Sequence, residues 1–360
     1  MALVVSLALL LPTSVKPAKE STAHTNTVWP TGYVTCPQNA TGLIMAMMTQ
    51  NATVQADTDR HVEYTSSTHA PAASTEEIEI QEVNRTITNV TFGGHGSKVV
   101  RFSGVSNAAV SPSNEVFVAD TFNRRVQVFN MEGVYLRKFP TVVSVEGSET
   151  MNPYDMSIDG KGHLWVIGET DSLELILVRY TKTGRHIITI HPPSLFTTFN
   201  DIAVDTLRNH VIVIAENAQG ARVSREVMVL LYNGTVVRKF ETRQGWPNFI
   251  TVDRNGRYLV TDVYKTRDLV YVYSETGQYQ FSFGSEGRIS TPMGICVYSS
   301  GKFVLVADGY DVSLEMFTDS GEHVRRVVPG VMFTGIAVAP GGQLVLVNEI
   351  HDTVTILSRY

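Results

Sequence analysis

The sequence contains almost no cysteine. Cys36 and Cys296 are the two examples among 360 residues, and Cys296 lies in the apolar run GICVY. Two cysteines cannot form a disulfide framework, and they are too few to supply the ligands of a RING or B-box zinc module. We therefore expect Cys296 to be a thiol buried in a hydrophobic core.

The sequence also lacks an excess of positive charge. From residue 91 onward, 25 Lys and Arg oppose 27 Asp and Glu. This near-neutral balance argues against DNA and other polyanions as general partners. The HExxH pair, the nucleophile elbow and the phosphate-binding loop are absent as well. We predict a protein that is not an enzyme and that uses no cofactor or metal.

The N-terminal apolar run is too short to cross a bilayer by itself. It covers residues 2–11 (ALVVSLALLL), and a small-residue cleavage site is available at Ser21-Thr22-Ala23, but a basic flank is missing. We treat residues 1–18 as an apolar leader, either a signal peptide or a truncated membrane anchor. It favours a secreted or membrane-anchored extracellular protein over a cytoplasmic one, with membrane contact through this leader alone.

The segment after the leader shows no sustained hydrophobic period. Residues 11–90 contain 20 Ser and Thr with scattered Pro and Ala. Such a composition buries too little apolar surface to offset the entropy lost on ordering. We therefore predict a disordered Ser/Thr-rich stalk over residues 19–87. Five sequons are candidates for glycosylation, at Asn39, Asn51, Asn84, Asn89 and Asn233.

What the sequence does contain is a repeat. The stretch VFVADTFNRRVQVFNMEG (116–133) has weaker versions at 258–277 and 304–321, and a short small-apolar strand followed by a polar turn recurs six times. The spacings between copies are 48, 46, 48, 45 and 41 residues, which suits one four-stranded propeller blade per copy. The residues that align the six copies are Val110, Ile158, Val204, Val252, Val297 and Val338.

Each copy predicts four short strands, a to d. In the first copy they are 108–110, 116–119, 126–129 and 135–139, each β-branched or aromatic and bounded by turn residues. No segment shows a convincing helical period. The fold class is therefore all-β.

The two ends of the repeat predict how the ring closes. The sixth copy stops after its c strand (TVTILS, 353–358), while an orphan strand, NVTFGGHG (89–96), precedes the first copy. The orphan resembles QFSFGSEG (280–287), the d strand of copy four. A strand exchanged between the termini would remove the open edge of the sheet. We predict a six-bladed propeller over residues 88–360, closed by an N-terminal strand.

The repeat resembles the NHL repeat, most closely at Asn123, Arg125 and the run 126–129 (VQVF). Over about residues 88–360 the chain looks most like the NHL propellers at the C-terminus of tripartite-motif proteins. Those proteins carry upstream RING, B-box and coiled-coil modules, and the RING gives them ubiquitin-ligase activity. This sequence shows none of those modules, so the resemblance implies partner binding without ligase activity. WD40 and kelch signatures are absent, and YLVTD (258–262) approaches the YWTD pattern in one copy only.

A polar residue recurs at the end of each b strand. We interpret these residues as structural, because each can accept backbone N–H bonds in its own b–c loop. The alternative is a metalloenzyme, since amidating lyases and lactonases resemble such rings, but His163, His186, His210 and His323 all fall in or near turns. The recurring residues are Asp120, Glu169, Glu216, Asp262, Asp308 and Asn348.

The b–c loops and d–a connections of a propeller share one face. Aromatic residues lie two places past the b-strand carboxylate in three copies, and Ile350 is near the equivalent place in the sixth. Aromatic residues with arginines are typical of protein hot spots and also suit unstacked bases; alternatively, the rings pack over neighbouring loops. The candidate partner-binding residues are Phe122, Asn123, Arg124, Arg125, Arg243, Trp246, Tyr264, Lys265, Arg267 and Tyr310.

Three functions stay open at this point. The first is a non-catalytic scaffold that recognises a protein, as the partner-binding domain of tripartite-motif proteins does. The second is binding of single-stranded RNA, because some NHL rings of that family bind RNA on this face. The third is a secreted lyase- or lactonase-like enzyme. The near-neutral charge favours a protein partner over RNA.

Overall fold

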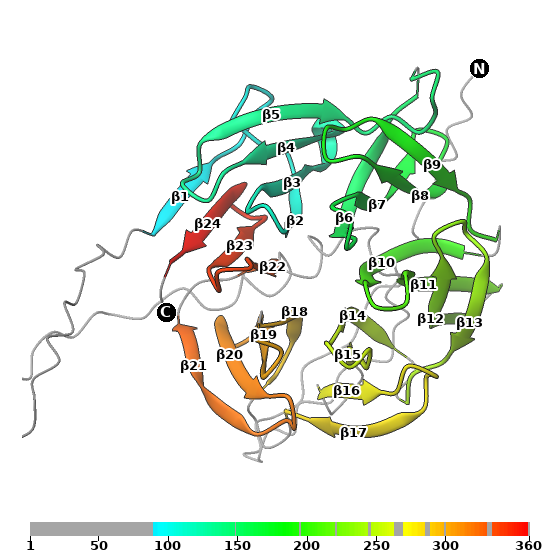
Figure 1. Cartoon of the computed structure of the whole chain (residues 1–360), viewed down its shortest axis with the longest axis vertical. Helices are drawn as coiled ribbons and strands as arrows, with labels where there is room; N and C mark the ends of the chain where they lie inside the picture. The colour runs from blue at the N-terminus through cyan, green and yellow to red at the C-terminus, as the bar shows by residue number, and fades with distance from the viewer. Residues whose placement is uncertain are drawn as a thin grey trace, which may run out of the picture. The chain divides into compact units, whose positions relative to one another are not determined.

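Antiparallel four-stranded sheets account for nearly all regular structure in the described residues. The computed structural model describes residues 89–358, except 148, 194–195, 220–221, 244–245, 263–268, 285–288, 299 and 330–332. Six such sheets stand in a ring, each forming one blade (Figure 1). The prediction of an all-β, six-bladed propeller is confirmed.

The strands follow one another outward within each blade, so that the a strands line the centre. Blade 1 contains β2 (Val105–Val110), β3 (Val116–Asp120), β4 (Arg125–Phe129) and β5 (Tyr135–Pro140). Blade 2 contains β6 (Met151–Ile158), β7 (Leu164–Thr170), β8 (Leu175–Tyr180) and β9 (His186–Ile190). Blade 3 contains β10 (Phe196–Asp205), β11 (His210–Gln219), β12 (Arg222–Leu231) and β13 (Val236–Phe240).

The remaining blades repeat this order. Blade 4 contains β14 (Pro247–Val252), β15 (Tyr258–Asp262), β16 (Leu269–Tyr273) and β17 (Tyr279–Phe283). Blade 5 contains β18 (Pro292–Val297), β19 (Phe303–Asp308), β20 (Ser313–Thr318) and β21 (His323–Pro329). Blade 6 contains β22 (Gly335–Val338), β23 (Leu344–Asn348), β24 (Thr353–Leu357) and β1 (Val90–Gly93). A short 3-10 helix, η1 (Thr121–Asn123), lies between β3 and β4.

The predicted strands of the first copy are all present, but the a strand begins earlier than expected. β2 starts at Val105 rather than Ala108, because Val105 pairs with Asp120 across an irregularity in the register. Pairing patterns of this kind cannot be read from a run of apolar residues.

The hydrophobic core lies between neighbouring sheets. One cluster joins blades 6 and 1 through Phe102, Val105 and Phe129 on one side and Val345 and Ile356 on the other. Similar clusters fill the other gaps around the ring. Because each blade buries both faces against its neighbours, the ring needs every blade to be complete.

β1 completes the last blade. It pairs antiparallel with β24, from Val90 opposite Ile356 to Gly93 opposite Thr353. The ring of Phe92 packs on Phe129 of blade 1, with centroids 4.5 Å apart. The prediction that an N-terminal strand closes the propeller is therefore confirmed.

The a–b turns place one residue in the left-handed region. At Gly256 this conformation (φ +77°) coincides with a close approach, because the Arg208 guanidinium of blade 3 occupies the space that a Cβ would need. Blades 3 and 4 are thereby linked at the edge of the ring. The positive φ favours glycine at this position.

Cys296 is a free, buried thiol, as predicted, and burial raises its pKa. Cys36 lies outside the described residues. Among those residues, no helix is long and apolar enough to cross a membrane.

Candidate partner-binding face

One side of the ring carries the b–c loops and the d–a connections; we call it the b–c face. Four apolar side chains are exposed at the tips of its b–c loops. The exposed fractions are 61% for Phe122, 71% for Leu173, 69% for Tyr310 and 40% for Ile350. These loops belong to blades 1, 2, 5 and 6, which are consecutive around the ring (Figure 1).

Phe122 combines local packing with exposure. Its backbone N–H donates to the Ser103 carbonyl at 3.0 Å. Its ring covers Gly104, where a Cβ would lie 2.5 Å from Phe122 Cε2. One side of the ring is therefore fixed against the loop, and the other side faces solvent. Both interpretations that the sequence left open describe part of this residue.

The exposed apolar surface extends beyond the residues that the sequence indicated. Leu173 (71% exposed) and Val145 (86% exposed) lie on the b–c face in blade 2 and in the connection that leads to it. Leu173 is four places past the end-of-strand carboxylate, not two, so the aromatic pattern did not reveal it. The positive φ of Leu173, 63°, turns its side chain outward from a tight turn.

Arg124 and Arg125 are neighbours with different environments. Arg124 forms a two-armed contact with Asp171 of blade 2, in which Asp171 is largely exposed and Arg124 is partly exposed. Arg125 is only 8% exposed, and its Nε donates to Asp120 Oδ2 at 2.6 Å. The prediction that Arg125 binds a partner is therefore wrong, because its guanidinium is buried and hydrogen-bonded to the Asp120 carboxylate.

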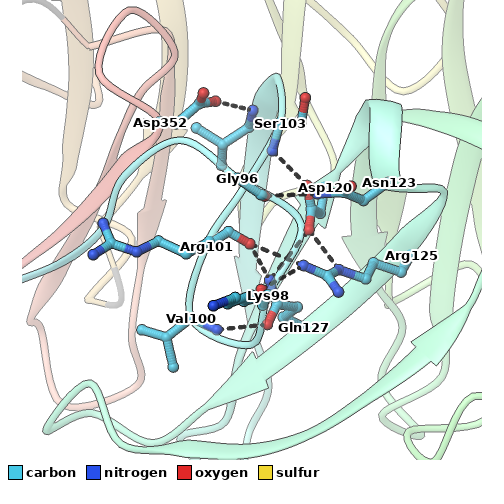
Figure 2. Close-up of polar contacts among 11 residues, drawn as sticks. Gly96, Lys98, Val100, Arg101, Ser103, Asp120, Asn123, Arg125, Gln127 and Asp352 are labelled. Carbon is cyan, nitrogen blue, oxygen red and sulfur yellow. Dashed lines mark hydrogen bonds and ion pairs between the residues drawn. The ribbon is translucent and has the colours of Figure 1, made fainter.

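Asp120 is the centre of the network in which Arg125 takes part (Figure 2). It is fully buried and accepts the Ser103 N–H at 2.8 Å. It also accepts hydrogen bonds from Asn123 Nδ2 at 2.8 Å and from Gln127 Nε2 at 3.1 Å. Asn123 is thus also occupied within the fold, and the residues that carry the NHL resemblance prove to be structural.

The network fixes the connection between blades 6 and 1, residues 94–104. Arg125 Nη2 donates to the carbonyls of Lys98 and Arg101, at 2.8 and 2.9 Å. Gln127 donates to the Arg101 carbonyl and accepts the Val100 N–H, at 2.7 and 3.1 Å. The backbone of this connection is therefore held by Arg125 and Gln127 (Figure 2), and the side chains of Lys98 and Arg101 are exposed.

The other residues at the ends of the b strands also serve the fold. Asp308 accepts the backbone N–H groups of Ser290 and Tyr310, at 2.8 and 3.0 Å. Asn348 accepts the His351 N–H at 3.0 Å within its own loop. In the remaining blades the partners are side chains: Tyr154 for Glu169, Arg225 for Glu216 and Thr242 for Asp262. Asp308 and Asn348 therefore accept N–H groups of their own b–c loops, as predicted, whereas Asp120, Glu169, Glu216 and Asp262 make structural contacts of other kinds.

Two further predicted residues lie on the connection between blades 3 and 4. Arg243 is exposed, and its guanidinium lies 4.6 Å from the ring centre of Tyr279. Trp246 is half-buried beneath the guanidinium of Arg225, also at 4.6 Å. The predicted residues Tyr264, Lys265 and Arg267 lie outside the described residues.

Only some of the glycosylation candidates lie among the described residues. Asn89 and Asn233 are exposed at the surface of the propeller. Asn39, Asn51 and Asn84 lie outside the described residues.

A pair of buried carboxyls lies beside the central channel, and the sequence reading did not single it out. Asp155 and Asp201 occupy equivalent positions of blades 2 and 3, three residues before Ile158 and Val204. Asp155 Oδ2 accepts the Ile202 N–H at 3.0 Å, and Asp201 Oδ2 accepts the Ile250 N–H at 2.5 Å. The signal was present in the sequence as DMSI and DIAV at the same place in two copies.

Burial raises the pKa of both carboxyls, and the nearby charge of Asp155 raises the pKa of Asp201 further. The channel next to them encloses about 260 Å³ and is lined by all six a strands. In the described part of the chain, no three His, Cys, Asp or Glu side chains come together in a way that could hold a metal ion. The histidines that the sequence singled out stand apart, with His163 and His186 in blade 2, His210 in blade 3 and His323 in blade 5.

Comparison with known proteins finds relatives for the propeller. No family model matches the chain. The chain is 26% identical over 306 residues to the mouse E3 ubiquitin-protein ligase TRIM32, a match that covers 75% of this chain and 44% of that protein. It is 25% identical over 296 residues to human TRIM32, covering 71% and 42%. The chain thus spans less than half the length of these curated relatives.

A solved streptogramin B lyase superposes with a TM-score of 0.54 at 12% identity, covering 76% of this chain and 98% of that one. At this identity the likeness shows the fold alone. Together with the six-bladed ring, the relatives support the resemblance seen in the repeat. The chain is a six-bladed propeller that resembles the NHL propellers at the C-terminus of tripartite-motif proteins.

Proposed function

We propose that this propeller is a non-catalytic scaffold that binds a protein partner on its b–c face. The observation that carries the proposal is the set of exposed apolar loop tips on four consecutive blades, Phe122, Leu173, Tyr310 and Ile350. Isolated exposed apolar residues are ordinary on protein surfaces, whereas a set gathered on one face is typical of interaction sites. Phe122 and Tyr310 add the aromatic side chains that are enriched at binding hot spots.

The backbone beneath these side chains is held in place. η1 presents Phe122, and the hydrogen bonds of Asp120 hold both ends of that loop. Asp308 fixes the Tyr310 loop through the N–H groups of Tyr310 and Asp311, at 3.0 and 3.3 Å. A surface that is ordered before binding loses little entropy on association.

The similar proteins are named as E3 ubiquitin-protein ligases. Such an enzyme must select the proteins on which it acts. We assign that kind of selection, rather than the ligase chemistry, to the region described here. An enzymatic role like that of the lyase would need catalytic side chains converging on the channel. The titratable side chains in its described wall are Asp201, whose carboxyl accepts the Ile250 N–H, and Cys296, a buried thiol whose pKa is raised by burial.

Proximity labelling in cells tests this proposal. The wild type is compared with a triple variant, Phe122→Ala, Leu173→Ala and Tyr310→Ala. The control carries Val134→Ala and Leu207→Ala, which remove exposed apolar side chains from turns on the opposite face. We expect the triple variant to keep its melting temperature and lose a discrete set of labelled proteins that the control retains.

Three results would contradict the proposal. Unchanged labelling by the triple variant would move the binding surface elsewhere. A large fall in its melting temperature would show that these side chains serve packing. Labelled proteins that disappear after nuclease treatment would indicate RNA as the bridging partner.

A further inference from the structure

Two groups of exposed charged side chains lie on the part of the b–c face that blades 6, 1 and 2 form. The first, the basic sector, lies on the connection between blades 6 and 1, where His95, Lys98 and Arg101 are exposed. One carboxylate of blade 6, Asp352, is turned inward: its Oδ1 accepts the Val105 N–H at 2.9 Å and its Oδ2 contacts His95 Nδ1 at 2.8 Å. Lys98 and Arg101 therefore contribute positive charge that this buried carboxylate does not neutralise.

The second, the acidic sector, lies one blade further on. Glu146 and Glu149 are exposed on the connection between blades 1 and 2, and Asp171 and Glu174 are exposed in the b–c loop of blade 2. His191 contacts Glu174 at 2.7 Å. Glu146 and Glu149 have no cation beside them on their own connection, which runs from residue 141 to 150.

The two sectors meet at the contact between Arg124 and Asp171, whose Nη1 and Oδ2 atoms are 2.6 Å apart. Exposed apolar side chains accompany each sector. Phe122 and Ile350 lie beside the basic one, and Leu173 and Val145 lie within the acidic one. The face is thus a strip across blades 6, 1 and 2 that changes sign along its length and carries apolar side chains throughout.

We propose that the partner binds this strip as an extended polypeptide segment of opposite polarity. Its acidic residues lie over Lys98 and Arg101, its apolar side chains contact Phe122 and Leu173, and its basic residues lie over Glu146 and Glu149. The inference rests on the proposed function and specifies the kind of partner. A nucleic acid, which is negative along its whole length, would be repelled by the acidic sector.

The basic end of the strip is rigid. The carbonyls of Lys98 and Arg101 are both bonded to Arg125, so the two side chains project from a fixed backbone. Charges held in place before binding discriminate between partners more than mobile ones, because like charges brought together cannot move apart. The direction in which a segment lies on the strip is thereby determined by its charge order.

Selection from a displayed library of random peptides of about 15 residues, which span about 50 Å when extended, tests the inference. The wild-type propeller is used for selection, and the triple apolar variant is used to remove background. We expect enriched peptides with acidic residues toward one end, basic residues toward the other and apolar residues between. Affinities are then measured for two variants, Lys98→Glu with Arg101→Glu, and Glu146→Lys with Glu149→Lys.

Each charge-reversal variant should weaken binding of the enriched peptides about tenfold or more at low salt. A control with Lys161→Glu and Lys302→Glu, in exposed turns of the opposite face, should bind as the wild type does. The melting temperature of each variant is measured alongside, because Arg101 Nη1 also donates to the Gly93 carbonyl at 2.7 Å.

The outcomes separate the two proposals. Enriched peptides without charge order, or peptides whose affinity falls in only one of the two charge-reversal variants, would overturn the polarity inference. They would not contradict the proposed binding face. Failure to enrich any peptide over the apolar variant would contradict the binding face itself. An oligouridine probe that is weakened by the first reversal and strengthened by the second would show that the strip binds RNA.

Discussion

The carboxyl of Asp201 interacts with the carboxyl of Asp155, and both side chains are buried beside the central channel. Two carboxylates in such a place cannot both be ionised without strong repulsion. Burial and the neighbouring charge raise the pKa of Asp201 well above its ordinary value. The folded protein therefore holds a proton here that an unfolded chain releases near pH 4.

The first prediction concerns the pH dependence of stability. The pKa of Asp201 is raised in the folded state. Its stabilising contribution to the free energy of unfolding is therefore complete below about pH 4 and is lost as the pH rises toward the folded pKa. The free energy of unfolding should fall by up to about 1.4 kcal/mol per pH unit over that window. Asp201→Asn should reduce this slope, because the amide does not titrate and can still accept the Ile250 N–H. Chemical denaturation at pH 5 and pH 8 measures the effect.

Asp155→Asn is the matched control. The Asp155 carboxyl accepts from Met156, Ile202 and Asn107, so an amide NH₂ would meet a donor. This variant should lose about 1–3 kcal/mol at both pH values. Equal behaviour of the two variants would contradict the assignment of the shared proton to Asp201.

The second prediction concerns the end of the closing strand. Gly93 has φ +112°, and a Cβ there would lie 2.6 Å from the Asp352 carbonyl oxygen. Gly93→Ala should lower the free energy of unfolding by about 3 kcal/mol, through backbone strain and the clash together. Gly147→Ala is the control, because φ is +71° and nothing lies within 4 Å; it should cost about 1 kcal/mol. Similar costs would mean that β1 is loosely attached at this end.

The third prediction compares the two adjacent arginines through their carboxylate partners. Asp120→Ala leaves the buried Arg125 charge unpaired and should cost about 3–5 kcal/mol. Asp171→Ala removes an exposed contact of Arg124 and should leave the free energy of unfolding almost unchanged. Thermal unfolding of both variants provides the measurement. A large effect of Asp171→Ala would give the surface contact a structural role that its exposure does not support.

The fourth prediction concerns the compartment. Asn233 is exposed in a c–d turn, and its Oδ1 accepts the Thr235 N–H at 3.0 Å. If residues 1–18 direct the chain into the secretory pathway, Asn233 should carry a glycan. Mass spectrometry after expression in animal cells should show a glycosidase-sensitive mass that Asn233→Gln reduces by one glycan. A mass equal to that of the bare polypeptide would contradict the secretory assignment.

The blade count and the closure were predictable because they depend on periodicity. Strand length, turn residues and the missing sixth d strand are all local features of the sequence. The b–c face was only partly predictable, because exposure depends on which loops lie together in space. Arg124 and Arg125 have the same chemistry and adjacent positions, yet strand β4 turns one inward to Asp120 and leaves the other outside. Leu173 was missed because its turn differs from that of Phe122, and Asp201 because its partner is 46 residues away.

The closing strand also dictates an order of events during synthesis. Thr91 is among the first residues of the propeller to leave the ribosome, yet its hydrogen-bonding partner, Thr355, follows 264 residues later. Until then the hydrogen-bonding edge of β1 and the face of blade 1 that packs against blade 6 have no permanent cover. Contacts between such distant residues slow folding and expose the growing chain to aggregation. The propeller therefore remains open for most of its synthesis. During that time a chaperone could bind the uncovered apolar surface.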